Sequence, residues 1–310
     1  MQKITFCPGP GALIPEWTKS QKEFFGRNDK EYQKIKNKTL QWLKKISQKD
    51  FVIPIAGSGS NAAVVAINTF LTGKILIVNT GYYSNRWFRE IKNTINYTKI
   101  YNVKYEDLKF FNKEINYILF VYVETGLCKK FDIQKIFDLK KKFKAKLIID
   151  AVASIGLEEN HKLADVVFFS SCKGLFGPTG LGFIGYNKNC RLIKAKSFVT
   201  NYVSHQKGLY TLGYNCMSAL YFISKKYNFY KDRLEYAHKI LKKYSSHNEI
   251  CKIGISLKYK IKKNNKNFIF YTPRKKNKFE LIFILGLIKF PKKEIKKIIE
   301  NEIIKNFIQK

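Results

Sequence analysis

Between residues 51 and 190, short apolar runs alternate with segments of helical periodicity, and this alternation leaves few folds open to the chain. Continuous apolar strands separated by helices are typical of an open, mostly parallel sheet with helices on both faces. We therefore expect an α/β fold with a mostly parallel seven-stranded sheet. The expected strands are Phe51–Ile55, Lys74–Val78, Lys99–Tyr101, Tyr117–Val123, Lys146–Asp150, Val166–Ser170 and Gly182–Tyr186. The expected helices cover residues 60–72, 84–95 and 132–144, with a short turn near 155–160.

The N-terminal region does not show the alternation of strands and helices. Residues 1–15 contain Pro8-Gly9-Pro10-Gly11 and Pro15, which disfavour helix, so we expect an extended arm. Residues 16–47 carry apolar side chains at helical spacing and predict helix with a break near Gly26.

The pattern of expected helices and strands changes again after residue 190. Residues 214–245 predict one long helix, and a final amphipathic helix is expected from Pro291 to about residue 307. The lysine-rich segment 258–278 predicts an exposed hairpin or loop. Three further strands are expected at Lys252–Tyr259, Phe268–Thr272 and Leu281–Ile288. These features predict an N-terminal arm (1–15), a large domain (16–215) and a small C-terminal α+β domain (216–310).

The net charge of +35 raises the question of a polyanionic partner. The basic residues are nearly all lysine, and asparagine and isoleucine are abundant, which fits a coding bias spread over solvated faces. We therefore expect neither a nucleic-acid nor a membrane partner. The six cysteines are scattered without paired metal spacing, and no N-terminal stretch reads as a signal peptide. A cytoplasmic protein with reduced thiols and no metal is expected.

Three polar features follow strands of the expected sheet. Lys173 comes shortly after Ser170-Ser171 and opens the Gly/Pro-rich turn 174–180. Asp150 ends another apolar strand, and Gly57-Ser58-Gly59-Ser60 opens a helix. Because ligands of open parallel sheets bind at the carboxyl ends of strands, we expect these features to share one site.

Each feature also has an ordinary structural explanation. Alone, Lys173 reads as a surface lysine, Asp150 as a turn cap and Ser58 as the cap of a helix. Together they supply an amine that forms Schiff bases, an acid for a pyridinium nitrogen and a helix N-terminus for a phosphate. These are the protein groups that pyridoxal phosphate (PLP) requires. We therefore predict PLP as the cofactor, with Lys173 and Asp150 as catalytic residues.

Three neighbouring residues are candidates for the same site. Tyr83 could stack on a planar cofactor ring, although core packing is the commoner fate of such an aromatic. Thr125 could donate a hydrogen bond to the cofactor or simply cap a turn. Val152 follows Asp150 closely enough to orient the ring.

In this order and at these spacings, the segments resemble the class V aminotransferases among the fold-type I PLP enzymes. The likeness is greatest to alanine–glyoxylate, serine–pyruvate and 2-aminoethylphosphonate–pyruvate transaminases, and it covers residues 4 to about 220. The matching segments are Cys7-Pro8-Gly9-Pro10, Arg27–Tyr32, Gly57–Ser60, Thr80–Arg86, Glu124-Thr125, Ile149–Gly156 and Ser170–Gly180.

The resemblance implies a fold-type I enzyme that moves an amino group from a small donor to a keto acid such as pyruvate or glyoxylate. It implies Lys173 as the Schiff-base residue, Tyr83 as the stacking ring and a homodimer whose sites are completed by the partner subunit. The implied cofactor-binding residues are Ser58, Gly59, Ser60, Tyr83, Thr125, Asp150, Val152, Ser171, Lys173 and Thr211.

The chain departs from the family pattern at several positions. Gly126-Leu127-Cys128 replaces a Ser-Thr-Gly segment, and Gly213 stands where a phosphate-binding threonine is usual, with Thr211 or Asn215 as a substitute. In the small domain, Leu281 stands where relatives carry an arginine for the substrate carboxylate, and Arg274 or a nearby lysine is a candidate replacement. Without such an arginine, a donor that lacks an α-carboxylate, for example an aminophosphonate, is favoured over alanine or serine.

Two other functions stay open. A PLP-dependent lyase, decarboxylase or desulfurase would keep the cofactor, and a desulfurase would need a thiol such as Cys128 or Cys172 near it. A non-catalytic protein of the same fold could instead use its basic surface to bind a partner. Products of the reaction, or binding without PLP, would separate these functions from amino-group transfer.

Overall fold

The computed structural model describes residues 3–9, 14–20, 26, 28–93, 97–263, 266–273 and 278–308. Several positions used above lie outside the described residues: Pro10, Gly11, Arg27 and Arg274.

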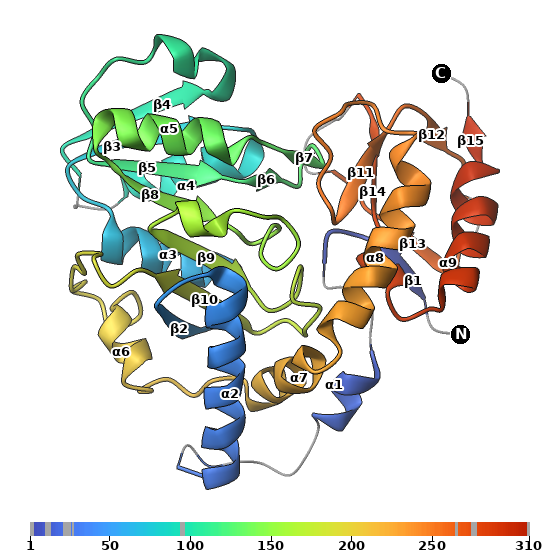
Figure 1. Ribbon diagram of the computed structural model, residues 1–310, viewed down its shortest axis with the longest axis horizontal. Coiled ribbons are helices and arrows are strands. Elements are labelled where there is room, and N and C mark those ends of the chain that lie inside the picture. The colour runs from blue at the N-terminus through green and yellow to red at the C-terminus, as the bar shows by residue number, and fades with distance from the viewer. Residues whose placement is uncertain are drawn as a thin grey trace.

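The central sheet has seven strands in the order β2-β10-β9-β8-β5-β3-β4 (Figure 1). β10 runs antiparallel to both of its neighbours, and the remaining pairs are parallel. This confirms the predicted mostly parallel α/β sheet. The strands are β2 (Phe51–Ala56), β3 (Lys74–Asn79), β4 (Lys99–Lys104), β5 (Tyr117–Val121), β8 (Lys146–Asp150), β9 (Val166–Ser170) and β10 (Leu181–Tyr186).

Helices cover both faces of this sheet. α3 (Gly59–Phe70) and α4 (Tyr82–Lys92) pack on one face, where Ile148 and Phe168 project. α2 (Lys30–Ser47), α5 (Ile133–Phe143) and α7 (Tyr214–Ser224) pack on the other, where Leu147, Ile149 and Phe169 project. Because side chains alternate along a strand, Asp150 and Ser170 fall on the α3/α4 face at the carboxyl ends of β8 and β9.

Shorter elements connect these layers and edge strands. They are α1 (Pro15–Lys19), η1 (Tyr105–Phe110), β6 (Val123–Glu124), β7 (Lys129–Lys130), η2 (His161–Leu163) and α6 (Tyr202–Gln206). β6 and β7 form a two-stranded ribbon of their own. The predicted strand 117–123 is therefore divided between β5 and β6.

The prediction of one helix over 214–245 is wrong. The helix is interrupted at Lys225-Lys226, and α8 (Tyr227–Lys242) starts in a new direction. The interruption seats Tyr227 beneath the lysine-bearing turn, where its hydroxyl donates to the Gly174 carbonyl at 2.8 Å and its ring stacks on Phe176. This tertiary contact ends one helix and begins the next, which no local periodicity reveals.

The C-terminal lobe, at the right of Figure 1, contains α8 and several small sheets. The N-terminal strand β1 (Ile4–Phe6) joins this lobe by pairing with β13 (Phe268–Phe270), and the Phe6 ring stacks on Phe268 and Phe270. The division of the chain at residues 15 and 215 stays a prediction. The other elements of the lobe are β11 (Gly254–Leu257), β12 (Lys260–Ile261), β14 (Glu280–Phe283), η3 (Leu285–Leu287), α9 (Lys292–Ile299), η4 (Glu300–Ile304) and β15 (Phe307–Ile308).

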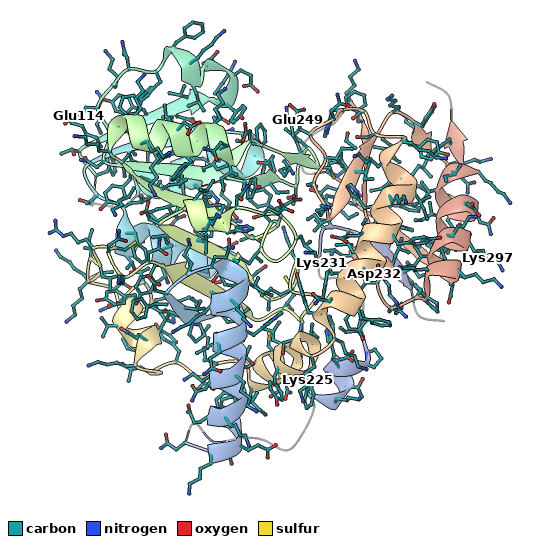
Figure 2. The ribbon with its side chains drawn as sticks, viewed as in Figure 1. Glu114, Lys225, Lys231, Asp232, Glu249 and Lys297 are labelled. Carbon is teal, nitrogen blue, oxygen red and sulfur yellow. The ribbon has the colours of Figure 1, made fainter. Side chains whose placement is uncertain are left out.

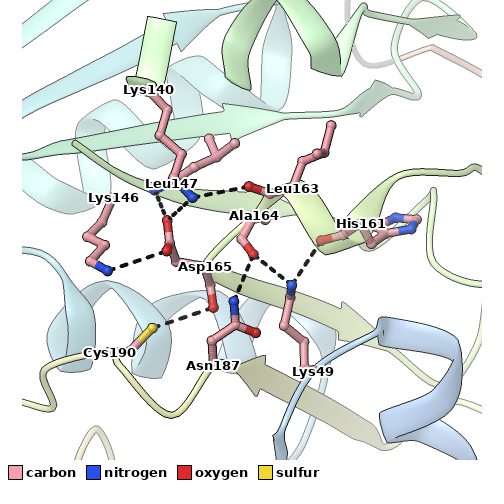
Figure 3. A network of polar contacts seen from close by, with 10 residues as sticks. All are labelled: Lys49, Lys140, Lys146, Leu147, His161, Leu163, Ala164, Asp165, Asn187 and Cys190. Carbon is pink, nitrogen blue, oxygen red and sulfur yellow. Dashed lines mark hydrogen bonds and ion pairs between the residues drawn. The ribbon is translucent and has the colours of Figure 1, made fainter. Parts of the chain in front are cut away.

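A polar network holds the end of the sheet opposite to Asp150 and Ser170 (Figure 3). Asp165, just before β9, accepts hydrogen bonds or ion pairs from Lys140 at 2.7 Å and from the Leu147 N–H at 2.8 Å. The buried Lys49 amine donates to the carbonyls of His161 and Ala164 at 2.9 and 2.6 Å. Burial lowers the pKa of Lys49 to about 8. These contacts fix the strand starts without reaching the opposite edge.

Lysines lie on both parts of the molecule. Figure 2 shows Lys225 and Lys231 along the α7–α8 region and Lys297 on α9 of the C-terminal lobe. Within the described residues, no helix combines the length and the apolar character that a bilayer span requires. Those residues also include no group of three or more His, Cys, Asp or Glu side chains placed to hold a metal ion.

Candidate active site

The turn that carries Lys173 is tightly held. The Ser171 hydroxyl donates to the carbonyls of Pro178 and Leu181 at 2.5 and 3.2 Å, and the Gly177 N–H donates to the Ser171 carbonyl. The Tyr227 hydroxyl fixes the same turn from the other side at Gly174. The backbone at position 173 is therefore set by contacts that leave the Lys173 side chain free to face the sheet edge.

The Lys173 amine lies 5.6 Å from the centroid of the Tyr83 ring. It has no hydrogen-bond or ion-pair partner among the described residues. The N-terminal arm also approaches this turn, because a side chain at Gly9 would meet Lys173 Cγ at 3.2 Å. An amine held close to an aromatic face and without a partner is available for covalent chemistry.

Asp150 is buried at the end of β8, and each of its oxygens accepts one hydrogen bond. Trp87 Nε1 donates to Oδ2 at 2.8 Å, and the Val152 N–H donates to Oδ1 at 2.9 Å. Burial raises the pKa of Asp150, while these hydrogen bonds and the charges of Lys173 and Arg86 act in the opposite direction. The protein thus supplies several groups that favour the ionised carboxylate in a desolvated place.

The start of α3 forms a narrow cradle at the same edge. Gly57 has φ of +110°, and the Ser58 side chain caps the helix by accepting from the Ser60 N–H at 3.2 Å. A Cβ at Gly59 would lie 2.9 Å from Val152 Cγ2 and 3.0 Å from Ser170 Cβ. Glycine is therefore required where the helix start meets β9, and the positive end of the helix dipole points into the site.

Glu124 is a buried carboxylate that holds Tyr83 in place. Its oxygens accept from the N–H groups of Tyr83 and Gly126, both at 2.9 Å. Burial raises the pKa of Glu124 to about 7, against the lowering effect of these hydrogen bonds. From the sequence, Glu124 is recognised only as part of a motif, because its contact with the start of α4 spans about 40 residues of chain.

Lys173, Asp150 and the start of α3 line one cavity of about 170 Å³. The structure brings most of the predicted site residues together in its wall: Ser58, Gly59, Ser60, Tyr83, Thr125, Asp150, Val152 and Lys173. The wall also contains residues that were not predicted as site residues: Arg86, Trp87, Val123, Ala153, Ser170 and Cys172. Arg86 and Trp87 follow Tyr83 by three and four positions, a helical spacing that could have identified them.

Two predicted site residues lie outside this wall. Ser171 is buried behind it, with its hydroxyl bound to the carbonyls of its own turn. Thr211 is exposed in the segment before α7. Their contacts with a cofactor stay predictions, and for Thr211 the predicted contact is with the cofactor of a partner subunit.

A larger cavity of about 1010 Å³ lies between the end of α2 and the α7–α8 junction. Its wall contains lysines such as Lys45 and Lys231 but none of the predicted site residues. His161 in that wall is buried, and burial lowers its pKa to about 3, so it stays neutral. The smaller cavity is the candidate active site, because its wall joins the amine, the carboxylate and the helix start.

Comparisons with known proteins identify relatives of this chain. The family model described as aminotransferase class-V matches residues 16–198. An uncharacterised aminotransferase of Methanocaldococcus jannaschii is 26% identical over 203 residues, which are 59% of this chain and 52% of that protein. A bifunctional phosphonoacetaldehyde hydrolase/aminoethylphosphonate transaminase of Clostridioides difficile is 26% identical over 207 residues, which are 60% of this chain and 32% of that protein.

A solved structure shows the same fold along nearly the whole chain. The aspartate aminotransferase of Thermus thermophilus superposes with a TM-score of 0.81 at 15% identity, covering 96% of this chain and 97% of that one. The chain spans about half the length of the first curated relative and a third of the second. The matched segment contains every predicted site residue except Thr211. The chain belongs to the class V aminotransferase family.

Proposed function

We propose that this protein is a PLP-dependent aminotransferase that moves an amino group from a small donor to a keto acid such as pyruvate or glyoxylate. The single observation that carries the proposal is the convergence of Lys173, Asp150 and the start of α3 in one cavity. Membership of the class V aminotransferase family supports amino-group transfer as the reaction.

The residues present fit PLP, the cofactor that the family implies. The Gly59 cradle has no room for a Cβ, so backbone N–H groups at the start of α3 can approach a phosphate closely. Asp150 accepts one hydrogen bond at each oxygen, and a carboxylate has about four acceptor sites, so it can still accept from a pyridinium N–H. The amine of Lys173 lies beside the Tyr83 ring and has no hydrogen-bond or ion-pair partner within the part of the chain that the structure describes.

When bound, PLP supplies an electron sink for the charge that develops on the substrate carbon. Ser58 and Ser60 would hold its phosphate, Tyr83 would cover its ring, and Asp150 would keep its nitrogen protonated. Lys173 Nζ would take a proton from the substrate carbon and return it nearby, as a general base and then an acid. Glu124 would keep Tyr83 in position by anchoring the start of α4.

The thiols argue against a desulfurase. Cys128 is fully buried, and burial raises its pKa well above the ordinary value, so it is a poor nucleophile. Cys172 lines the cavity, but its backbone belongs to the tightly held lysine turn, with Sγ 3.8 Å from Ser170 Oγ. Neither thiol sits on a segment that could swing toward a substrate.

We propose a homodimer whose contact includes the segment before α7. Phe198, Val199 and Leu209 expose 54, 59 and 48% of their surface in the same stretch as Thr211. Exposed apolar side chains in one segment favour a protein interface. A cytoplasmic location is proposed because all six cysteines are free thiols. Sedimentation of the purified protein tests the dimer.

The test of the function is a half-reaction with the reconstituted holoenzyme. A panel of amino donors, including alanine, serine and 2-aminoethylphosphonate, is added without any keto acid, and the visible absorption of the bound cofactor is followed. We expect at least one donor to convert the cofactor to its amine form and pyruvate or glyoxylate to restore it. Release of CO2 or sulfide instead, or salt-sensitive nucleic-acid binding without cofactor uptake, would contradict the proposal.

A further inference from the structure

Arg86 is a cation in the active-site wall to which the proposed mechanism gives no task. It follows Tyr83 by three positions on α4, so its side chain leaves the helix on the same side as the Tyr83 ring. Its guanidinium carbon lies 5.0 Å from the Trp87 ring centroid, and both residues line the cavity. One face of α4 therefore presents a ring, a guanidinium and an indole to the same space.

The guanidinium has no hydrogen-bond or ion-pair partner among the described residues. Arg233, in contrast, donates to the carbonyls of Ile288 and Lys289, both at 3.1 Å. Arg86 is near enough to lower the pKa of Asp150, yet the hydrogen bonds that Asp150 accepts come from Trp87 and Val152 and not from Arg86. A guanidinium has five donors in a rigid fork, and here the fork is unused.

Among the charged side chains of the cavity wall, Arg86 is the cation that the proposed function does not use. The wall contains one carboxylate, Asp150, and two cationic side chains, Arg86 and Lys173. Under the proposed function, Lys173 forms the covalent bond to the cofactor and Asp150 faces the ring nitrogen. A negatively charged group that enters this desolvated space then has Arg86 as its only cationic side chain within the described wall.

The small domain offers no replacement at the expected position. Leu281, which stands where the family carries a carboxylate-binding arginine, is 1% exposed in β14 and lies in the apolar core of the lobe. Its neighbour across the sheet is Ser256 on β11. The place where a guanidinium would be expected is therefore closed and apolar in this chain.

We propose that Arg86 is the oxyanion receptor of the active site, binding the carboxylate, phosphonate or phosphate of a molecule in the cavity. This inference rests on the proposed function, because it assumes that the cavity holds cofactor and donor. The oxyanion that Arg86 binds can come from two sources, the acidic group of the amino donor or the phosphate of the cofactor. The planar fork of Arg86 suits either, since it can give two parallel hydrogen bonds to neighbouring oxygens.

The test compares Arg86→Gln with wild type and with Arg89→Gln. Arg89 is on the same helix but exposed and outside the cavity wall, so its variant removes the same charge from the same element. Arg86→Lys keeps the charge but loses the planar fork. It replaces Arg86→Gln in the comparison if Arg86→Gln does not fold. Melting temperatures establish that each variant is native.

Two binding measurements identify the source of the oxyanion. In the first, spectral titration of the holoenzyme compares alanine or 2-aminoethylphosphonate with ethylamine, which has no acidic group. In the second, equilibrium dialysis of the apoprotein compares PLP with pyridoxal, which has no phosphate. Arg86→Gln is expected to weaken binding of the acidic member of at least one pair by about 10- to 100-fold and leave the neutral member unchanged.

Weaker binding of the acidic donor with unchanged ethylamine would show that Arg86 binds the donor. Weaker binding of PLP with unchanged pyridoxal would show that Arg86 binds the cofactor phosphate. Arg86→Lys is expected to fall between wild type and Arg86→Gln, and Arg89→Gln to match wild type. Equal affinities of Arg86→Gln and wild type for all four molecules would overturn the inference. The proposed function is judged separately, by whether the wild-type holoenzyme completes its half-reaction.

Discussion

Trp87 Nε1 donates a hydrogen bond of 2.8 Å to Asp150 Oδ2, and both side chains are almost fully buried at the end of β8. The indole holds the carboxylate in one orientation, while the Val152 N–H holds its other oxygen. Together they offset part of the cost of keeping a charge in a desolvated site. Trp87 is thus a positioning residue that acts through Asp150.

Trp87→Phe is expected to weaken PLP binding by about tenfold or more, since a hydrogen bond to a charged group contributes about 1.5–3 kcal/mol. Loss of the donor raises the pKa of Asp150 further, so the affinity should fall more steeply with decreasing pH than in wild type. Absorbance titration of the apoprotein at several pH values measures both effects. Trp42→Phe, on α2 and away from this cavity, is the matched control. Equal affinity and an equal pH profile for Trp87→Phe and wild type would show that the indole has no positioning role.

Glu124 gives a pH dependence of stability with a definite sign. Its folded-state pKa of about 7 lies above the ordinary value of 4.5 because of burial. The protonated form therefore contributes stability that is complete below about pH 4.5 and is lost as the pH rises through about 7. Relative to Glu124→Gln, which does not titrate, the unfolding free energy of the wild-type apoprotein should fall by about 2 kcal/mol between about pH 5 and about pH 8.

Urea unfolding of both proteins across this pH range measures the difference. The comparison is insensitive to a constant offset between glutamate and glutamine, because only the change with pH is used. A difference that stays flat, or that moves in favour of the wild type as the pH rises, would show that Glu124 is ionised throughout.

Tyr227 links the start of α8 to the turn that carries Lys173. Its hydroxyl is the donor to the Gly174 carbonyl, and Tyr227→Phe leaves that buried carbonyl unpaired. We expect a loss of about 1–2 kcal/mol in unfolding free energy and faster release of PLP on dialysis. Tyr236→Phe on the same helix, at a residue with no hydrogen bond to this turn, is the control. If both variants release the cofactor at the wild-type rate, the contact is structural only.

The sequence predicted the inner strands of the sheet well because they are buried on both faces. β8 and β9 have the predicted bounds, since each is a continuous apolar run closed by a polar residue. The α7–α8 interruption could not be predicted, because Lys225-Lys226 has no helix-breaking residue. It arises from the contact of Tyr227 with a turn about 50 residues away in the chain. Local patterns indicate elements, while contacts of this kind decide where a helix changes direction.

The site, too, contains residues that could be predicted from the sequence and residues that could not. Lys173, Asp150 and Ser58 could be found because each follows a strand, and strand ends of a parallel sheet meet at one edge. Arg86 and Trp87 were not predicted, although they follow Tyr83 at helical spacing, because only the Tyr83 ring had been considered on that face of α4. Ser171 was predicted as a site residue, but its hydroxyl donates to the carbonyls of Pro178 and Leu181 instead of facing the cavity. A polar residue in a motif can serve the turn rather than the ligand.

The account depends most on the covalent role of Lys173. The chain has 52 lysines, so the measurement has to distinguish this amine from a large background. The holoenzyme is reduced with borohydride, which fixes a bond between an amine nitrogen and the cofactor aldehyde carbon, and the digested peptides are analysed by mass spectrometry. We predict one cofactor per chain, attached at Lys173, with no stoichiometric label in Lys173→Ala. Stoichiometric attachment to another lysine, or no attachment above background in the wild-type protein, would contradict the account.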